Sequence, residues 1–243
     1  MIFGREDSKL EEIRQNNDDK DKRGKTLNYT EIRNNEEIRA LLKKGNDNLG
    51  VLGFTDHSTA HCALVAERAA DILKVLGYDE HIRELAKIAG FMHDIGNAIN
   101  RSHHAEYGAI LAYELLKETD LSIDDRLTIV SAIGNHDEKD GVAVDAVTAA
   151  LIIADKTDVR RSRVQSSKEE FDIHDRVNYA VTDADVIVDK EEMTITLKLE
   201  IDESICSMYE YFEIFLGRMS MSRRAAAVFG AKFKVTVNGS KVL

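Results

Sequence analysis

The chain has 243 residues, of which 43% are hydrophobic and 32% are charged, and its formal net charge is −11 at pH 7. A chain of this length can bury a full core as one large domain or two small ones, and no apolar run approaches the roughly 20 residues that span a bilayer. The acidic balance disfavours nucleic acid and acidic membranes as partners, because like charges repel, but it does not exclude a small anionic substrate.

The two cysteines and the N-terminal sequence bear on the cellular compartment in which the protein is expected. Cys62 and Cys206 stand in apolar helical patterns without metal-type spacing, which is typical of reduced thiols in a core. The N-terminal sequence MIFGREDSKLEEIR has no positively charged region followed by an apolar stretch, so it does not resemble a secretory signal. We therefore expect a cytoplasmic protein.

Residues 1–45 predict a polar N-terminal arm with a short helix. The segment NNDDKDKRGK at 16–25 has the composition of a solvated or disordered stretch, and EEIRALLKK at 36–44 has helical spacing.

Residues 46–165 predict a helical domain, because apolar side chains recur there at helical spacing in five segments. Gly77 ends the first segment and Gly96 stops the second. The last segment is apolar on most faces, so we expect it to be the buried central helix. The five helices are expected at about 60–76, 82–95, 104–118, 122–136 and 143–158.

Residues 166–243 predict a small α+β module. DVIVDKEEMTITLKLEID alternates with period two and indicates a hairpin that turns near DKEE, SMYEYFEIFLGRMSMSRRAAAVFG returns to helical spacing, and AKFKVTVNG indicates a final strand. The fold class is therefore mainly α: a helical bundle followed by a small ββαβ module.

Histidines and aspartates recur in or beside the expected helices of the bundle. Imidazole nitrogens and carboxylate oxygens together suit a divalent transition metal, and a metal held by them can acidify a water and neutralise phosphate charge. A buried carboxylate beside a buried imidazole at a helix end is also costly unless it is paired or bound to metal. The candidate metal ligands are His61, His93, Asp94, His104, His136 and Asp155.

Each residue also has an ordinary structural explanation. His61 could be a hydrogen-bonded core histidine, and Asp94 could cap the helix end. Asp155 could pair with a nearby cation, while His104 and His136 could be surface residues near helix ends. The ordered set favours a metal site, because independent structural causes would have to recur at every position.

The motif order His, His-Asp, Asp on successive helices resembles the HD-domain superfamily of metal-dependent phosphohydrolases. His61, His93-Asp94 and Asp155 match that order. HAEYGA at 104–109 and NHDEKDG at 135–141 resemble the additional histidine segments of the multinuclear members. The whole chain is also similar to an uncharacterised bacterial group of HD proteins in which FDIHDRVNYAV and the ββαβ tail recur.

The resemblance implies an HD-type bundle and a phosphohydrolase that uses a metal-activated water to cleave a phosphoester or phosphoanhydride bond of a nucleotide-like metabolite. The ligand set would hold two divalent ions, with Asp94 bridging them. Because neutral imidazoles contribute most of the ligands, Fe, Mn, Zn, Co or Ni is favoured over Mg.

Two departures narrow the expected substrate. Members that hydrolyse cyclic dinucleotides carry paired histidines followed by Gly-Tyr-Pro, but here Asn135 replaces the first of the pair and GVAV stands where the triplet would be. The ligand set is more similar to that of two-metal diadenosine-tetraphosphate hydrolases, although the C-terminal module is not theirs.

The candidate catalytic residues are Asp94, His57, Arg101 and Lys156. We expect Arg101, together with His103, to meet a phosphate. His57 could donate to a leaving group, but we expect it to support the ligands.

A second basic group follows Asp155 and is expected either to meet phosphate or to compensate a helix C-terminus. Its members are Lys156, Arg160, Arg161 and Arg163. Asp158 is expected to be structural, and DIHDR at 172–176 a polar turn.

Two other functions remain open from the sequence. A non-catalytic HD protein that senses a metal or nucleotide would need fewer of the ligand and basic positions, and a structural zinc site would normally contain cysteine. We expect a small phosphorylated partner and no membrane partner, and we leave open assembly into a homo-oligomer.

Overall fold

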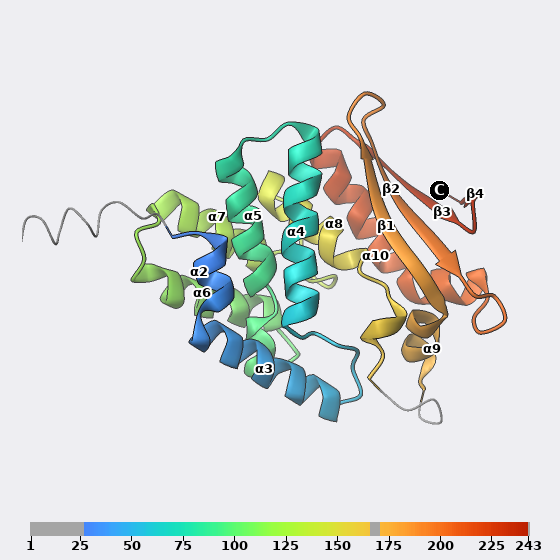
Figure 1. The fold of residues 1–243 in the computed structure, drawn as a ribbon, viewed down its shortest axis with the longest axis horizontal. Helices are drawn as coiled ribbons and strands as arrows, with labels where there is room; N and C mark the ends of the chain where they lie inside the picture. The colour runs from blue at the N-terminus through green and yellow to red at the C-terminus, as the bar shows by residue number, and fades with distance from the viewer. Residues whose placement is uncertain (1–26, 166–170, 243) are drawn as a thin grey trace, which may run out of the picture.

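The computed structural model describes residues 27–165 and 171–242, so the solvated segment expected at 16–25 lies outside the described residues. A bundle of helices occupies one end of the molecule and a four-stranded sheet the other (Figure 1). The expected fold class, a mainly α protein with a helical bundle and a small C-terminal α+β module, is confirmed.

Within the described residues, two helices precede the bundle's main helices. They are α2 (Tyr29–Asn34) and α3 (Glu36–Val51), so the expected short helix is longer than its 36–44 estimate and has a neighbour before it. Asn28 and Asn35 begin the two helices, since each side chain accepts a hydrogen bond from a backbone N–H in the first turn.

Five helices form the bundle where the apolar periodicity placed them. They are α4 (Thr59–Leu76), α5 (Glu80–Met92), α6 (His104–Lys117), α7 (Ile123–Gly134) and α8 (Ala146–Lys156). A short 3-10 helix, η1 (Ile95–Ala98), follows α5. Gly77 ends α4 with a φ of 93°, which favours glycine. α8 is buried along nearly its whole length, as its apolar pattern predicted.

The C-terminal segment contains more elements than the sequence indicated. They are η2 (Arg161–Arg163), α9 (Ile173–Ala180), β1 (Val181–Asp189), β2 (Thr194–Ile201), α10 (Met208–Val228), β3 (Lys232–Val237) and β4 (Ser240–Lys241). The polar turn expected at 172–176 is wrong, because Asp172 is the N-cap of a true helix and its side chain accepts from the Asp175 N–H. The final strand expected at the C-terminus is followed by a second short one.

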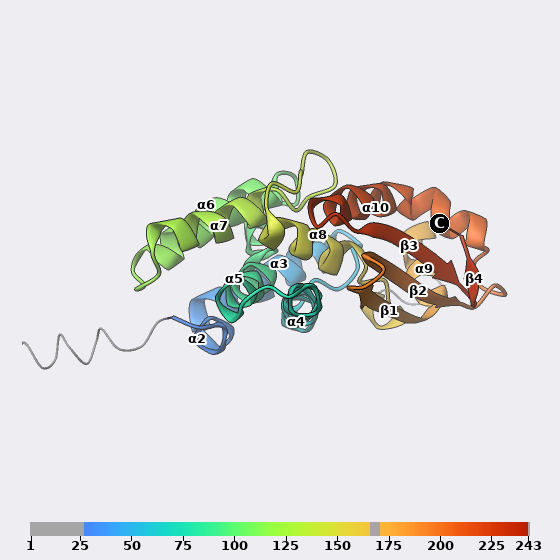
Figure 2. The same ribbon diagram turned by 90° about the horizontal axis from the view of Figure 1, so that it is seen from above.

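The sheet has the order β1-β2-β3-β4, with β1 antiparallel to β2, β2 parallel to β3 and β3 antiparallel to β4. A parallel pair needs a crossover, which α10 supplies between β2 and β3. α10 runs along one face of the sheet (Figure 2) and contributes Tyr211 and Phe215 to the apolar core beneath it.

α8 joins the two halves. Ala150, Leu151 and Ala154 pack in the core of the bundle, whereas Ile152 and Ile153 pack in the core beneath the sheet. Because one buried helix belongs to both cores, α9 and α10 are held beside the helix ends of the bundle.

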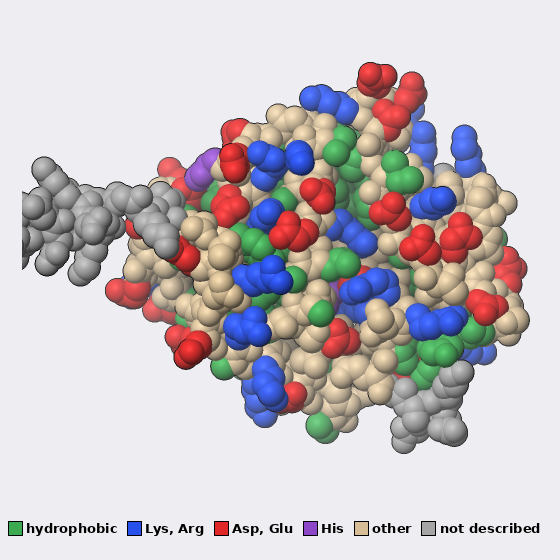
Figure 3. All heavy atoms as spheres, viewed as in Figure 1, with side chains coloured by type: hydrophobic (Ala, Val, Ile, Leu, Met, Phe, Trp, Pro, Cys, Tyr) green, Lys and Arg blue, Asp and Glu red, His purple; other side chains and the backbone are tan. Residues whose placement is uncertain are grey.

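None of the helices within residues 27–165 and 171–242 combines the length and the apolar character that a membrane span requires. On the face shown in Figure 3, acidic and basic side chains are interspersed over the bundle and the sheet.

The close crossing of α4 and α5 yields the first prediction. A Cβ atom added at Gly90 would lie 2.7 Å from the Ala66 Cα, within a backbone contact that cannot open without separating the helices. We expect Gly90→Ala to lower the free energy of unfolding by about 1–3 kcal/mol, measured by urea denaturation. The control is Gly50→Ala in α3, where the nearest atom lies at 3.7 Å and the change should be neutral or stabilising by up to about 1 kcal/mol. Equal effects would contradict the crossing as the cause.

Candidate metal centre

The ends of five bundle helices meet around a group of buried histidines and aspartates. His61 lies in the first turn of α4 and Asp155 in the last turn of α8. His93 and Asp94 follow the C-terminus of α5, and His104 begins α6. His136, which follows the C-terminus of α7, completes the group. The structure thus brings all six predicted ligands together.

Two helix C-termini orient their histidines in the same way. The last carbonyl groups of an α-helix have no partner within the helix. The His93 Nδ1 lies 2.8 Å from the Gly90 carbonyl oxygen, and the His136 Nδ1 lies 2.6 Å from that of Ile133. Each imidazole therefore donates Nδ1–H to the helix end that precedes it, which leaves Nε2 as an acceptor.

The other two histidines are fixed through Nδ1 as well. The Nδ1 of His61 lies 2.7 Å from the carboxylate of Asp158, and the Nδ1 of His104 lies 3.2 Å from the backbone oxygen of Arg101. With Nδ1–H donating in each ring, the Nε2 lone pairs are free to bind a metal, and a ring held by a carboxylate is the more basic ligand.

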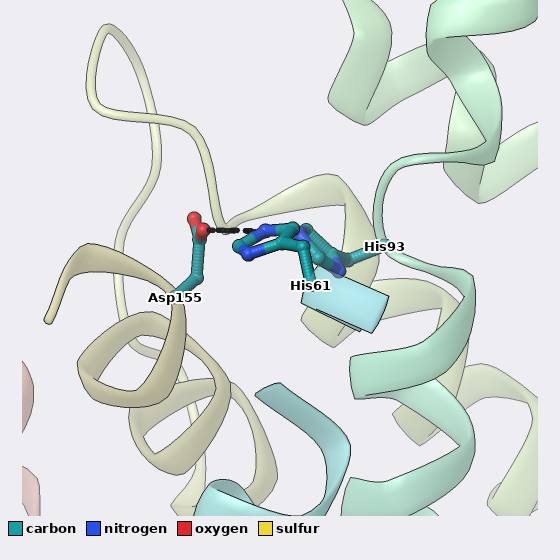
Figure 4. Close-up of side chains that lie close together, drawn as sticks. All are labelled: His61, His93 and Asp155. Carbon is teal, nitrogen blue, oxygen red and sulfur yellow. Dashed lines mark ion pairs between the residues drawn. The ribbon is translucent and has the colours of Figure 1, made fainter. Parts of the chain in front are cut away.

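The first group of candidate ligands consists of His61, His93, Asp94 and Asp155, and Figure 4 shows His61, His93 and Asp155 close together. The His61 Nε2 lies 3.4 Å from Asp155 Oδ1 and 3.7 Å from Asp94 Oδ2, while the His93 Nε2 lies 3.7 Å and 3.2 Å from the same two atoms. Atoms that bind one ion at about 2.0–2.2 Å lie roughly 3–4 Å from one another, depending on the angle between them. The spacing therefore fits a single transition metal ion.

The hydrogen bonding supports the same fit. Within the described residues, the Nε2 atoms of His61 and His93 and the Oδ2 of Asp94 are buried without a hydrogen-bond partner. Buried polar atoms normally have partners, and leaving several unpaired together is costly. A cation at their centre would satisfy all three.

A second group lies on the other side of Asp94. It consists of Asp94, His104 and His136, whose ligand atoms lie within 4.8 Å of one another. The two Nε2 atoms of His104 and His136 are only 3.1 Å apart. A hydrogen bond between them would require one ring to give up its Nδ1–H bond to a backbone carbonyl. If both rings keep those bonds, two lone pairs face each other, an arrangement that a second cation would stabilise.

Asp94 is positioned between the two groups. Its Oδ2 faces the first group, and its Oδ1 lies 3.7 Å from the His104 Nε2 and accepts a hydrogen bond of 2.7 Å from Asn97. The turn after it depends on Gly96, because a Cβ there would lie 2.0 Å from the His104 carbonyl oxygen. Glycine therefore allows this turn to pack against the start of α6.

The protonation states suit metal binding in most of the site. Burial raises the pKa of the Asp94 carboxyl, but the positive charges that His93 and His57 can carry outweigh burial, so this pKa lies well below its ordinary value. Burial lowers the pKa of His104 and, more strongly, that of His136. His93 differs. Burial lowers its pKa, but the negative charges of Asp94 and Asp155 raise it by more, so the net shift is upward. Carboxylates and neutral imidazoles are the ligand forms, and a metal would displace the proton that His93 attracts.

Cys62 lies close enough to His93 and Asp94 to be considered as a ligand. Burial raises the pKa of its thiol well above the ordinary value, and Asp94 raises it further. Only the thiolate binds metal, so we interpret Cys62 as a core residue.

The predicted catalytic residues line a pocket above the ligands. His57, Arg101 and Lys156 all contribute to it, and every residue of its lining is ionisable. The Lys156 Nζ lies 2.7 Å from the Asp155 Oδ2, and the Arg101 Nη1 lies 3.4 Å from the His104 Nε2. Arg218 of α10 also lines this pocket, a contribution that was not predicted from the sequence.

His57 lies just before α4, and its Nδ1 is 2.6 Å from the Thr55 carbonyl oxygen. Its ring centroid is 5.6 Å from that of His61, so the two rings are neighbours although only His61 is helical. Desolvation lowers the His57 pKa well below its ordinary value, which favours the neutral imidazole.

Some basic residues expected near phosphate lie elsewhere. His103 is exposed and lies 3.2 Å from Glu106, outside the pocket lining. Arg160 pairs with Asp158, and Arg161 donates to the Tyr179 carbonyl oxygen. Of the basic group after α8, Lys156 and Arg163 line the pocket.

Asp158 and Arg163 have positioning roles that the sequence did not reveal. Asp158 is fully buried and holds the His61 ring, although it lies 97 positions from it in the chain. Arg163 donates to the backbone oxygens of both Asp158 and Asp56, so it ties the segment after α8 to the segment before α4. In the sequence, the position of Asp158 one helical turn beyond Asp155 was the only indication of such a role.

With this geometry established, the family comparison is decisive. Residues 59–177 match the family model for the HD domain. This segment of the chain is therefore similar to the HD domain. HD domains are generally metal-dependent hydrolases of phosphate bonds that bind divalent metals, and the buried histidines and aspartates could hold such ions. The HD resemblance based on motif order is therefore confirmed.

A curated relative adds similarity without a function. The chain is 28% identical over 171 residues to an uncharacterized protein, MJ1020, of Methanocaldococcus jannaschii. The match covers 60% of this chain and 65% of that relative.

The second prediction concerns Asp158. We expect Asp158→Asn to weaken metal binding by about 10- to 100-fold, because the His61 ring loses the carboxylate that fixes its orientation and raises its basicity. Chelator competition with Mn²⁺ or Zn²⁺ would measure the change. The control is Asp125→Asn, which removes a carboxylate from the exposed His81 instead. Because Asp158 is buried, the unfolding temperature should be measured too; unchanged metal affinity in a folded variant would contradict the role.

Proposed function

We propose that this HD-domain protein is a metal-dependent phosphohydrolase that cleaves a phosphoester or phosphoanhydride bond of a nucleotide-like metabolite. The observation that carries the proposal is the convergence of buried, unpaired ligand atoms from His61, His93 and Asp94 beneath a pocket of ionisable side chains. The family supports a metal-dependent hydrolase in general, and the substrate class is our inference.

Two ions would be held on either side of Asp94. His61, His93, Asp94 and Asp155 would hold one, and Asp94, His104 and His136 the other. Divalent ions there would supply Lewis acidity, making a water more acidic and neutralising charge on the phosphoryl oxygens. The imidazole-rich set favours Fe, Mn, Zn, Co or Ni.

The protein's own side chains complete the proposed chemistry. Arg101, Lys156 and Arg218 line the pocket and would bind phosphoryl oxygens, where negative charge develops during transfer. Lys156 is also anchored by Asp155, so its ammonium group is fixed in position. His57 donates Nδ1–H to a carbonyl oxygen, which leaves Nε2 as an acceptor for a proton on the water or on a polar group of the substrate.

The alternative is a sensor that binds a metal or nucleotide without turnover. It would need the ligands but not the cations that line the same pocket, so Arg101 and Lys156 favour the enzyme. The deciding experiment is metal analysis of the purified protein together with a phosphate-release screen over nucleotides, dinucleotides and phosphomonoesters with added Mn²⁺, Fe²⁺ or Zn²⁺. Bound metal without phosphate release from any of these would favour the sensor.

The third prediction tests Asp94 in catalysis. We expect Asp94→Ala to reduce phosphate release by at least about a thousandfold, because it removes a ligand from both proposed ions and the charge between them. The variant should keep its fold, as judged by circular dichroism. Turnover near that of the natural protein would refute the proposed mechanism.

The fourth prediction concerns the number of ions. We expect His136→Ala to lower the bound metal by about one equivalent, because only the second group loses a ligand. Mass-spectrometric metal analysis of the equilibrated protein would measure it. The control is His81→Ala, an exposed histidine outside the site, which should leave the metal content unchanged. Unchanged stoichiometry and full activity in His136→Ala would indicate a single-metal site.

A further inference from the structure

A second cavity opens beside the pocket above the metal centre. Its volume is about 440 Å³, within the range of small-molecule sites. It shares His57, Arg101, Glu138 and Arg218 with the metal-centre pocket, so the two are continuous. We call this cavity the side cleft.

The walls of the side cleft differ in chemistry from the pocket next to it. The loop before α4 contributes Phe54, and α10 contributes Ile214 and Phe215. The metal-centre pocket, by contrast, is lined by ionisable residues alone. A phosphate group suits the metal-centre pocket, whereas the organic part of a phosphorylated molecule suits the side cleft.

Two buried acceptors on α9 face the side cleft. Asn178 is 3% exposed; its Nδ2 donates to the His174 carbonyl oxygen, and its Oδ1 is buried without a partner among the described residues. Asp175 is 2% exposed, and its carboxylate forms no hydrogen bond or ion pair with any residue that the structure describes. Leaving the buried amide oxygen of Asn178 without a donor is unfavourable. The oxygens of the Asp175 carboxylate are not among the fully buried atoms without a partner, so this carboxylate is open to the cleft that it lines.

The helix terminus alone does not account for this pair. A carboxylate in the first turn of a helix is stabilised by the helix dipole, which favours an acid at Asp175. The capping bond, however, is made by Asp172, whose side chain accepts from the Asp175 N–H at 2.7 Å. Asn178 lies three residues further on the same helix face, where no capping role applies. A ligand in the side cleft would supply hydrogen-bond donors to the Asp175 carboxylate and the Asn178 amide oxygen.

We propose that the side cleft binds the nucleoside part of a nucleotide substrate, with Asp175 and Asn178 accepting hydrogen bonds from its sugar hydroxyl or base amino groups. The proposal rests on the proposed function, because the metal centre would hold the phosphate end. Aromatic and aliphatic walls suit a flat base, and neighbouring acceptors suit hydroxyl or N–H donors. A lipid phosphate would leave the acceptors unpaired, and a simple sugar phosphate would leave the apolar wall uncovered.

The fifth prediction is an equilibrium-binding test on the full chain loaded with metal. The probes are adenosine and guanosine 5′-monophosphates, ribose 5-phosphate and inorganic phosphate, measured by calorimetry. We expect a nucleotide to bind at least about tenfold more tightly than inorganic phosphate, and Asp175→Asn to reduce that ratio by about 10- to 100-fold, as loss of a hydrogen bond to a charged group predicts. Asp183→Asn, an exposed aspartate on β1, is the matched control and should keep the ratio.

Three outcomes would overturn the proposal. The first is that the ratio of nucleotide affinity to phosphate affinity stays unchanged in both Asp175→Asn and Asp175→Leu. The second is that neither nucleotide binds more tightly than inorganic phosphate. The third is that ribose 5-phosphate binds as tightly as the nucleotides. Asp175→Asn keeps the shape of the side chain, so it decides the test if the leucine variant does not fold.

The binding test also separates this proposal from the proposed function. A nucleotide preference that depends on Asp175, in a protein that releases no phosphate, would refute the hydrolase alone. Phosphate release from simple phosphomonoesters without any nucleotide preference would refute the side cleft alone.

Discussion

The metal centre depends on hydrogen bonds that fix each imidazole through Nδ1. His93 and His136 donate to carbonyl oxygens that their helices leave unpaired, and His61 donates to a buried carboxylate. When Nδ1–H donates in this way, Nε2 of the neutral ring carries the lone pair, and the partner of Nδ1 sets the direction of that lone pair. The helix ends therefore determine the chemistry of the site as well as its location, because they select the tautomer that binds metal.

Such a site is costly to build, and the rest of the fold holds it together. Lone pairs and carboxylates that face one another within a dry interior repel in the absence of a cation. The close crossing at Gly90 and the turn at Gly96 keep the helices from moving apart. α8 contributes apolar side chains to two cores, so displacing Asp155 would disturb both.

The sequence predicted the helical framework, because apolar periodicity is a local pattern. The structure brings the six candidate ligands together, which the order of His and Asp on successive helices also predicted. The sequence did not reveal what depends on contacts between distant segments. Asp158 holds His61 across 97 positions, and Arg218 reaches the pocket from α10. His103, which was expected to meet a phosphate, is exposed and lies outside the pocket lining, and it has a left-handed backbone conformation with a φ of 63°. The polar composition of 172–176 hid a helix that only its cap and buried face reveal.

The two walls of the side cleft belong to different parts of the chain, and this separation bears on how the protein could diversify. The metal ligands stand on the bundle, whereas the unpaired acceptors stand on α9 and much of the apolar wall on α10. Substitutions in α9 and α10 can thus alter which molecule is admitted without touching an atom that binds metal. Under the proposed function, selection or design could exchange substrates along this segment while the candidate metal ligands stay the same.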